Sequence, residues 1–223
     1  MNPIIENFFN VEALARSQKL LLIGLNTTLR LIGLGVLLAM GFGLFLAVLR
    51  HANRRWLNPL IIAYVDVVRA CPIIVLLMLI YYALPFIGIR FPAFWAATLA
   101  MSLNGGAYYS EIFRGGIEAI PRGQTEAARS LGLTYMQTMR MVILPQAIRI
   151  VLPPLTTNTL ELIKASAVAS TVALPDLLRQ ALQAQSLTLN ATPLVAALVL
   201  YLIILLPLVQ LVTFFERRLR NSG

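Results

Sequence analysis

Charged residues and the side chains that build metal or covalent sites are scarce in this sequence. Only 12% of the 223 residues are Asp, Glu, Lys or Arg, whereas soluble domains carry about 25%. The single cysteine, Cys71, excludes an internal disulfide and a Cys-rich metal site, and the single histidine, His51, lies in a basic stretch typical of a solvated surface. So little charge cannot cover a water-facing fold, and the composition therefore predicts a membrane protein.

Acidic residues are outnumbered by basic ones, which gives a formal net charge of +9. Nucleic-acid binding would account for such an excess. The basic residues, however, stand singly or in small groups between long apolar runs, and this distribution argues against a nucleic-acid partner. A cleavable signal is not expected either, because Glu6 and Glu12 precede the first apolar stretch, where a signal has a basic start. The mean hydropathy of +0.80 fits membrane spans with basic flanks.

Five segments are long and apolar enough to cross the hydrocarbon core of a bilayer, which takes about 20 helical residues. They are Leu20–Leu49, Leu57–Leu84, Phe91–Phe113, Val151–Val172 and Pro193–Phe215. The second segment is interrupted by Asp66, Arg69 and Pro72. We therefore predict an all-α integral membrane protein in which five transmembrane helices form one domain over residues 1–223.

The orientation of these spans follows from the basic residues, since cytoplasmic loops are enriched in Lys and Arg. If the N-terminus is outside, the basic residues on the inside are Arg50, Arg54, Arg55, Arg114, Arg122, Arg129, Arg140, Arg149, Arg217, Arg218 and Arg220. Those on the outside are Arg16, Lys19, Arg90 and Arg179. This excess on the inside predicts a periplasmic N-terminus and a cytoplasmic C-terminus.

The long cytoplasmic connection from Gly115 to Ile150 is predicted to be folded. Gly132 is well placed to end a first short helix. Thr134 and Gln137 form a T-x-x-Q capping box for a second helix, and Pro145 is expected to end it. The pattern fits either a surface hairpin packed on its own helices or a docking element for a cytosolic partner.

The same connection resembles the EAA loop of bacterial ABC importer permeases, whose pattern is E-A-A-x3-G-x9-I-x-L-P. The residues that carry the resemblance are Glu126, Ala127, Ala128, Gly132, Val142, Ile143, Leu144 and Pro145. Val142 in place of isoleucine is the one departure. The resemblance implies a MetI-like ABC importer permease fold. It also implies that Glu126, Ala127, Ala128, Gly132, Leu144 and Pro145 couple the chain to an ATPase.

The resemblance runs from Leu20 to Arg218, and it is strongest to permeases of polar amino-acid uptake. Residues 64–72 are similar to their Y-x-[DE]-x-x-R-x-x-P, residues 106–117 to their A-Y-x-[AS]-E-I-x-R-G-G-I, and Arg122-Gly123-Gln124 is also typical. Membership implies a bacterial inner-membrane permease that pairs with a second copy or a paralogue. It further implies two cytosolic ATPase subunits, which carry ATP and Mg, and a periplasmic binding protein that delivers an amino acid. This chain itself is expected to bind no cofactor.

Polar side chains inside the predicted spans are candidates for function, because burying them in a membrane is costly. Asp66 and Arg69 are three residues apart and are predicted to form a structural ion pair. Asn104 stands before two glycines, and it either contacts substrate or joins two helices.

The fourth span holds the largest group of polar residues. Asn158, Glu161 and Lys164 recur at three-residue steps and are predicted to share one helix face, with Ser166 slightly beyond. Glu161 and Lys164 either neutralise each other or meet the ammonium and carboxylate of an amino acid. The related permeases usually read K-D-[ST]-[SA]-L here, and residues 164–168, Lys-Ala-Ser-Ala-Val, lack the aspartate.

Three other classes of protein fit the sequence less well. A secondary, ion-coupled transporter commonly shows internal inverted repeats, and none is found here. An enzyme needs a nucleophile with a base or a set of metal ligands, and no catalytic or metal-binding residues are predicted. No phosphate-binding G-x-x-x-x-G-K-[ST] loop occurs, and the polar residues of the fourth span argue against a membrane scaffold. A secondary transporter, and an ABC importer for an opine or another amino-acid-like solute, stay the alternatives.

Overall fold

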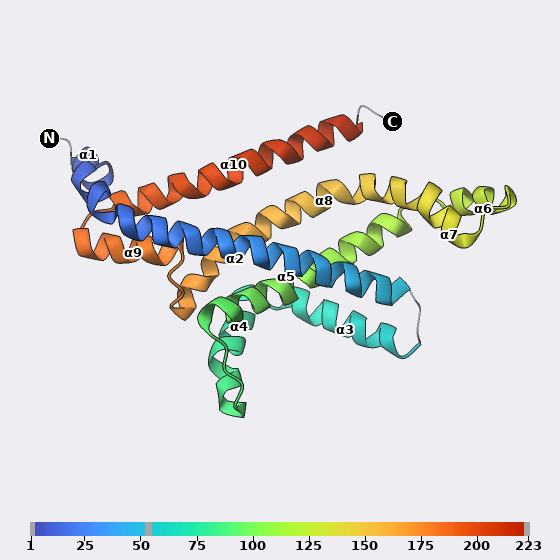
Figure 1. Cartoon of the computed structure of the whole chain (residues 1–223), viewed down its shortest axis with the longest axis horizontal. Coiled ribbons are helices and arrows are strands. Elements are labelled where there is room, and N and C mark those ends of the chain that lie inside the picture. Colours follow the sequence, from blue (N-terminus) through green and yellow to red (C-terminus); the bar gives the residue numbers. More distant parts are fainter. Residues whose placement is uncertain (1–2, 52–54, 221–223) are drawn as a thin grey trace.

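The computed structural model describes residues 3–51 and 55–220, and every regular element in these two ranges is helical. Four long helices lie along the length of the molecule (Figure 1): α2 (Val11–His51), α5 (Ala93–Glu118), α8 (Leu144–Ala165) and α10 (Thr192–Arg220). The shorter elements are α1 (Pro3–Phe8), α3 (Leu57–Ala70), α4 (Ile73–Met78), η1 (Leu79–Ala83), η2 (Leu84–Ile87), α6 (Arg122–Ser130), α7 (Tyr135–Thr138), η3 (Met139–Ile143), η4 (Ser166–Val172) and α9 (Leu177–Thr188). The predicted all-α class is confirmed, whereas Arg54, one of the inside-facing arginines, lies outside the described residues.

Helix α2 contains the first predicted span and begins well before Leu20. It starts after Asn10, whose side-chain oxygen accepts a hydrogen bond from the backbone N–H of Ala13 at 2.9 Å and so satisfies one of the free donors of the first turn. The helix has 41 residues, about 60 Å at 1.5 Å per residue. Because hydrocarbon is about 30 Å thick, α2 extends beyond it.

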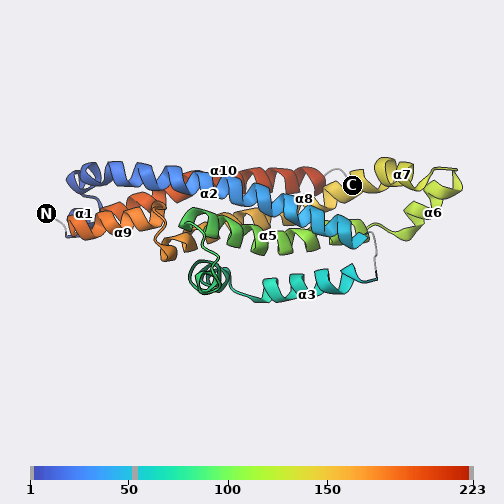
Figure 2. The same cartoon turned by 60° about the horizontal axis from the view of Figure 1, so that its bottom comes forward.

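The second predicted span is broken at Pro72. Helix α3 ends at Ala70, Cys71 and Pro72 are extended, and the chain then turns by 105° into α4 and the η elements that follow. Proline lacks an amide hydrogen and disfavours a helical conformation of the residue before it, so the break has a local cause. In Figure 2, α4 is seen end-on while α3 lies across the view. The segment 57–84 is therefore two helices at a steep angle and not one straight span.

Two helical stretches of the described chain, Glu6–His51 and Thr192–Gln210, are long and apolar enough to cross a membrane on their own, and the bent pair from Leu57 to Ile87 makes a third if it is one span. The fifth predicted span lies within α10. Helices α5 and α8 carry polar and charged side chains that lower their hydropathy, among them Asn104 and Glu161. The count of five spans stays a prediction.

Helices α2 and α5 pack closely because glycines face each other across their contact. A β-carbon added at Gly43 would lie 2.5 Å from the β-carbon of Tyr109, and one added at Gly106 would lie 2.6 Å from the ring of Phe42. Small residues of this kind let helix backbones approach within a membrane. Buried Leu31, Ala39 and other apolar side chains complete the core around this contact, with Tyr109 fully enclosed.

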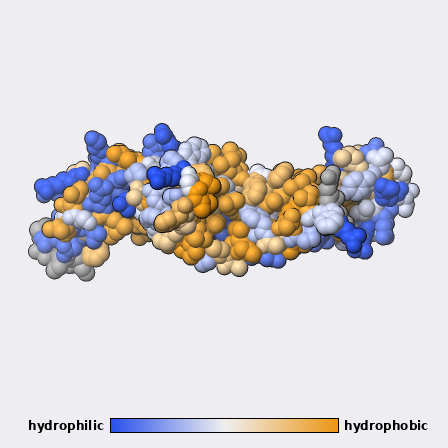
Figure 3. Space-filling view, turned by 90° about the horizontal axis from the view of Figure 1, so that it is seen from below, coloured by the Kyte–Doolittle hydropathy of each residue, from blue (hydrophilic) through white to orange (hydrophobic). Residues whose placement is uncertain are grey.

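The surface divides into an apolar middle and two hydrophilic ends on the face shown in Figure 3. Large apolar side chains are exposed along α2 and α10, including Leu37 at 68%, Phe45 at 56%, Leu198 at 58% and Ile203 at 61%. An exposed apolar surface of this extent fits lipid or another membrane subunit, because monomeric soluble proteins rarely carry one.

Candidate coupling loop and translocation residues

The loop that resembles the EAA motif projects beyond the end of the long helices and away from the N-terminus (Figures 1 and 2). Its first helix, α6, follows Pro121, whose backbone is extended. Glu126 and Ala127 are exposed on this helix, whereas Ala128 is buried, with 4% of its surface accessible. Of the three EAA residues, only the first two are therefore available to a partner.

Gly132 ends α6 as the sequence predicts. Its φ angle is +83°, in the left-handed region. The N–H groups of Gly132 and Leu133 donate to the carbonyls of Arg129 at 3.0 Å and Ala128 at 3.2 Å, which is the Schellman pattern of helix termination. A β-carbon at Gly132 would meet no atom within 4 Å. Backbone conformation, and not lack of space, therefore requires glycine here.

The capping box of α7 is confirmed. The backbone N–H of Gln137 donates to the Thr134 hydroxyl at 3.3 Å, and the backbone N–H of Thr134 donates to the Gln137 side chain at 2.9 Å. The expected stop at Pro145, however, is wrong. The wider π-helical turn η3 leads directly into α8, and Pro145 stands in the first turn of α8, where a missing N–H costs little. Leu144 and Pro145 therefore begin a long helix.

Exposed apolar and basic side chains share the surface of this loop. Leu131 is 83% exposed, Met136 69% and Met141 67%. A hairpin packed only on its own helices would bury such residues, so the exposure favours a docking surface. The base of the loop is anchored by the buried cluster of Ile120, Ile143 and Ala147.

A second anchor joins the loop to the end of α2. Nε2 of His51 and the hydroxyl of Tyr135 lie 2.5 Å apart, and their rings are stacked with centroids 6.3 Å apart. The single histidine thus contacts the loop helix α7, a contact between residues 84 positions apart that the sequence did not reveal.

On α8, Glu161 and Lys164 form an ion pair, as in the first of the two alternatives for these residues. Nζ of Lys164 donates to Oε1 of Glu161 at 2.7 Å, and the two side chains are 54% and 64% exposed. Asn158 lies beside the Tyr109 hydroxyl, and its amide nitrogen is buried with no hydrogen-bond partner among the described residues. Ser166 starts η4 and is 2% exposed. The structure therefore separates buried Ser166 from the exposed pair, because the chain changes from α to 3-10 geometry after Ala165.

Asn104 is turned toward α3. Its amide nitrogen donates to the backbone carbonyl of Val68 at 3.4 Å. No hydrogen bond joins it to Glu161 or Lys164 in the described chain. The geometry thus favours contact between two helices as the role of Asn104 in this conformation.

The predicted pair of Asp66 and Arg69 is wrong. Asp66 is exposed and makes no ion pair within the described residues. The Arg69 guanidinium instead lies over the ring of Tyr108, 5.3 Å from its centroid, and 4.0 Å from Oε2 of Glu111. Tertiary contact with α5 therefore prevails over the partner three residues away.

Glu111 is the functional candidate that the sequence reasoning missed. Its carboxylate accepts from Nη1 of Arg50 at 2.5 Å and from Nη2 of Arg114 at 2.6 Å. We call Glu111, Arg50, Arg69 and Arg114 the Glu111 cluster. Glu111 stands inside the motif of residues 106–117, and its three-residue spacing to Arg114 was a visible signal, but the contact to Arg50 spans 61 positions.

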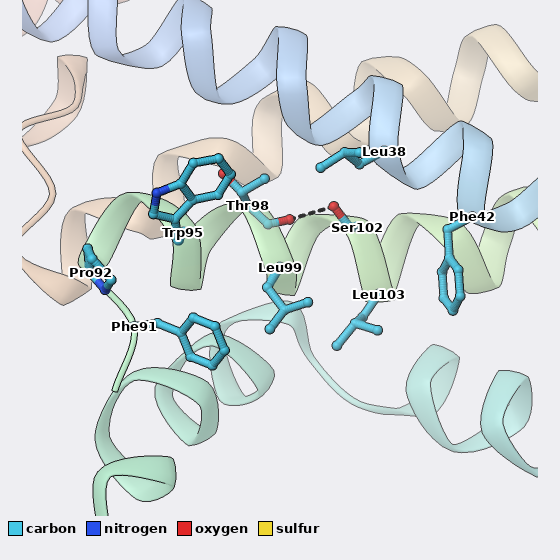
Figure 4. A pocket seen from close by; sticks show the side chains of 9 residues that line it. All are labelled: Leu38, Phe42, Phe91, Pro92, Trp95, Thr98, Leu99, Ser102 and Leu103. Carbon is cyan, nitrogen blue, oxygen red and sulfur yellow. Dashed lines mark hydrogen bonds between the residues drawn. The ribbon is translucent and has the colours of Figure 1, made fainter. Parts of the chain in front are cut away.

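The pocket drawn in Figure 4, of about 630 Å³, is apolar. Its lining side chains come from α2, from α5 and from the residues just before α5: Leu38, Phe42, Phe91, Pro92, Trp95, Thr98, Leu99, Ser102 and Leu103. The two hydroxyls among them donate to backbone carbonyls, Thr98 to Phe94 at 2.8 Å and Ser102 to Thr98 at 2.7 Å. The indole of Trp95 adds one N–H, and the lining contains no charged side chain, so this pocket fits lipid chains or apolar side chains better than a charged solute.

Comparison with known proteins gives one answer. The model of the family described as "Binding-protein-dependent transport system inner membrane component" matches residues 39–221. The probable amino-acid ABC transporter permease protein YckA of Bacillus subtilis is 41% identical over 176 residues, which are 79% of this chain and 78% of YckA. The arginine transport system permease protein ArtQ of the same organism is 35% identical over 201 residues, 89% of this chain and 92% of ArtQ.

Solved structures agree with these relatives. A crystal structure of an amino acid ABC transporter with histidines has a TM-score of 0.86 and 37% identity, and the match covers 94% of this chain and 98% of that one. The methionine ABC transporter MetNI in inward-facing conformations gives a TM-score of 0.72 at 26% identity, over 92% of this chain and 97% of that one. None of these relatives supports the secondary-transporter alternative. The chain belongs to the family of binding-protein-dependent transport system inner membrane components, the permease subunits of ABC importers.

Proposed function

We propose that this permease translocates a polar amino acid across the bacterial inner membrane, driven by ATP hydrolysis on separate subunits. The observation that carries the proposal is the folded loop between α5 and α8, with its EAA residues, its Schellman stop at Gly132 and its exposed apolar side chains. The substrate class is taken from relatives whose names give arginine, glutamine and L-cystine transport.

Two cytosolic ATPase subunits, carrying ATP and Mg, are the proposed partners of this loop. The sequence has no phosphate-binding loop of its own, so hydrolysis requires another chain. A second copy or a paralogue of the permease would cover part of the exposed apolar surface, and a periplasmic binding protein would deliver the substrate at the other end. The protein would then form one domain over residues 1–223, with its loop as the contact to the ATPases.

Alternating access is the proposed mechanism. The loop and the N-terminus lie at opposite ends of the molecule (Figure 1), which supports a periplasmic N-terminus together with the distribution of basic residues. Closure of the ATPase dimer would move the loops, and the attached helices would rock between inward-open and outward-open states. A loaded binding protein favours the outward-open state if it binds that state more tightly.

Glu161 and Lys164 are the residues we propose for substrate recognition, with Asn158, Ser166 and Asn104 as further candidates. An amino acid carries one charge of each sign, and this pair offers a complementary charge for each at the surface of α8. Asn158 and Ser166 add buried polar atoms that lack a partner in the described chain. The apolar pocket of Figure 4 has no comparable groups.

The test is uptake by the reconstituted importer with changes at this pair. The rest of the chain leaves both side chains more than half exposed, and removing the two charges together leaves no lone charge within the membrane. The double change Glu161→Gln with Lys164→Met should therefore leave the assembled complex intact and lower amino-acid uptake at least tenfold. The matched control is the exposed pair on α2, Glu12→Gln with Arg16→Met, which should import within twofold of the wild type.

Two outcomes would count against the proposal. If the double variant on α8 imports like the control, the pair does not contact substrate. If the wild-type importer takes up no member of a panel of labelled polar amino acids while the ATPase and the binding protein are both present, the substrate class is wrong.

A further inference from the structure

We propose that Glu111 is a positioning residue that holds α2, α3 and α5 in register with the coupling loop, so that ATP hydrolysis and transport stay coupled. This inference rests on the proposed function. It assigns a role to a carboxylate in the motif of residues 106–117. Glu111 belongs neither to the coupling loop nor to the substrate candidates.

The Glu111 cluster joins three helices at a single carboxylate. Arg50 comes from the end of α2, Arg69 from the end of α3 and Arg114 from α5, and α3 lies beside the other two helices (Figure 2). The Glu111 side chain is 19% exposed, and those of Arg50 and Arg114 are 23% and 31% exposed. Charges removed this far from water interact more strongly than surface charges do.

The charge balance makes Glu111 indispensable to the cluster. Three guanidinium groups surround it, and among the described residues only Arg114 has a second acidic partner, Glu118, to which its Nη1 also donates. Removing the Glu111 charge would leave Arg50 and Arg69 without an acidic partner in the cluster. A partly buried arginine without a partner is a costly state.

A direct path leads from the cluster to the coupling loop. Arg50 is followed by His51, whose ring contacts Tyr135 in the first turn of α7. Glu111 therefore binds the residue next to the one that holds the loop. A displacement of the loop that moves the end of α2 must act on the bond between Arg50 and Glu111.

The three contacts of Glu111 are unequal, and this inequality points to the one that changes during transport. Arg50 and Arg114 lie at 2.5 and 2.6 Å, whereas Arg69 lies at 4.0 Å, at the limit of an ion pair. Arg69 also stands one residue before the end of α3, where the chain turns by 105°. A small movement of α3 would thus make or break this contact while α2 and α5 stay joined.

The experiment measures how many substrate molecules are imported per ATP hydrolysed by the reconstituted complex of permease, ATPase and binding protein. Glu111→Gln keeps the shape of the side chain and removes its charge. We expect the number imported per ATP to fall at least tenfold. The matched control is Glu118→Gln, two turns of α5 further on and 62% exposed, which should stay within twofold of the wild type in the same ratio.

A second variant keeps the inference open to test if Glu111→Gln assembles poorly. Arg69→Met leaves the bonds from Arg50 and Arg114 in place and should lower the ratio at least threefold, with Arg69→Lys restoring part of it because an ammonium supplies the charge.

Equal ratios for the wild type, Glu111→Gln and Arg69→Met would overturn the inference. So would a parallel loss of assembled complex, ATP hydrolysis and uptake with an unchanged ratio, which is the result expected of a residue that only stabilises the fold. Failure of the proposed function is distinguishable, because the wild type would then import no amino acid at all.

Discussion

At the scale of single residues, two glycines are required for different physical reasons. Gly132 has open space around it but a φ of +83°, whereas Gly43 is in ordinary helical conformation with α5 pressed against it. Substitutions at the two positions should therefore respond to different properties of the new side chain.

At Gly132 the effect of a substitution should depend on the backbone preference of the new residue and not on its size. Asparagine enters the left-handed region with little cost, whereas a β-branched residue does so at a cost of roughly 1–2 kcal/mol. Gly132→Asn should retain the ATPase during purification of the complex, and Gly132→Val should lose most of it although both proteins insert in the membrane. Equal retention by the two variants would show that the Schellman stop is not needed for docking.

At Gly43 even one methyl group should be harmful. Its β-carbon would lie 2.5 Å from that of Tyr109 and 2.8 Å from the carbonyl oxygen of Gly106, so α2 and α5 must separate, at a cost of roughly 1–3 kcal/mol. Gly41 on the same helix has nothing within 4 Å of the same position. Thermal unfolding in detergent should show a lower midpoint for Gly43→Ala and an unchanged or higher one for Gly41→Ala. A similar drop in both would contradict the close contact.

At the scale of elements, helix α9 is anchored by a buried carboxyl group. Asp176 lies between the fourth and fifth predicted spans, is 1% exposed, and caps α9 by accepting from the backbone N–H of Arg179 at 2.9 Å. Its other carboxyl oxygen has no partner among the described residues. Burial raises the pKa of Asp176 to about 6, against the effects of the Arg179 amide and of its guanidinium, which lower it.

The stability of the protein should therefore depend on pH through Asp176. The folded pKa of about 6 is above the ordinary 3.8, so the native state binds the proton more tightly and stability falls as pH rises through this interval. Among the side chains near Asp176, Arg179 directs its guanidinium to the Ser170 carbonyl, and Thr28 of α2 and Tyr201 of α10 carry no charge at neutral pH.

The variant that isolates this effect is Asp176→Asn. It keeps the capping oxygen and cannot ionise, so its unfolding midpoint should lose the decline seen in the wild type between pH 4 and pH 6, an interval set by the two pKa values. If the two proteins show the same pH dependence in this range, the carboxyl group of Asp176 does not titrate as we infer.

Local signals in the sequence predicted where individual helices begin and end, but they did not predict contacts between segments that are far apart in the chain. The Thr134 capping box and the Gly132 stop depend on neighbours within four positions, so their residue types suffice. The predicted helix stop at Pro145 failed because the π-helical turn before it leads directly into α8, where proline is tolerated in the first turn. The predicted ion pair of Asp66 and Arg69 failed for a different reason, since Arg69 lies beside Glu111 on another helix. The helical class was predictable from composition and the break from Pro72, but no local signal gave the angle of 105° between the two helices.

At the scale of the whole molecule, the separation of the loop from the N-terminal end gives the orientation a direct test. Leu131 in the coupling loop is 83% exposed, and Leu187 near the end of α9 is 72% exposed. The loop and α9 lie at opposite ends of the long helices (Figure 1). The proposed topology puts Leu131 in the cytoplasm and Leu187 in the periplasm, because the basic residues are concentrated on the side of the loop.

Single cysteines at these two positions, in a protein with Cys71→Ser, should react from opposite sides of the membrane. A charged maleimide that does not cross the inner membrane should label Leu187→Cys in spheroplasts and leave Leu131→Cys unlabelled until the membrane is permeabilised. Both side chains are highly exposed in the chain itself, so a difference in labelling reports the side of the membrane and not burial in the fold. Labelling of Leu131→Cys before permeabilisation would reverse the orientation, and with it the assignment of the loop to a cytosolic ATPase.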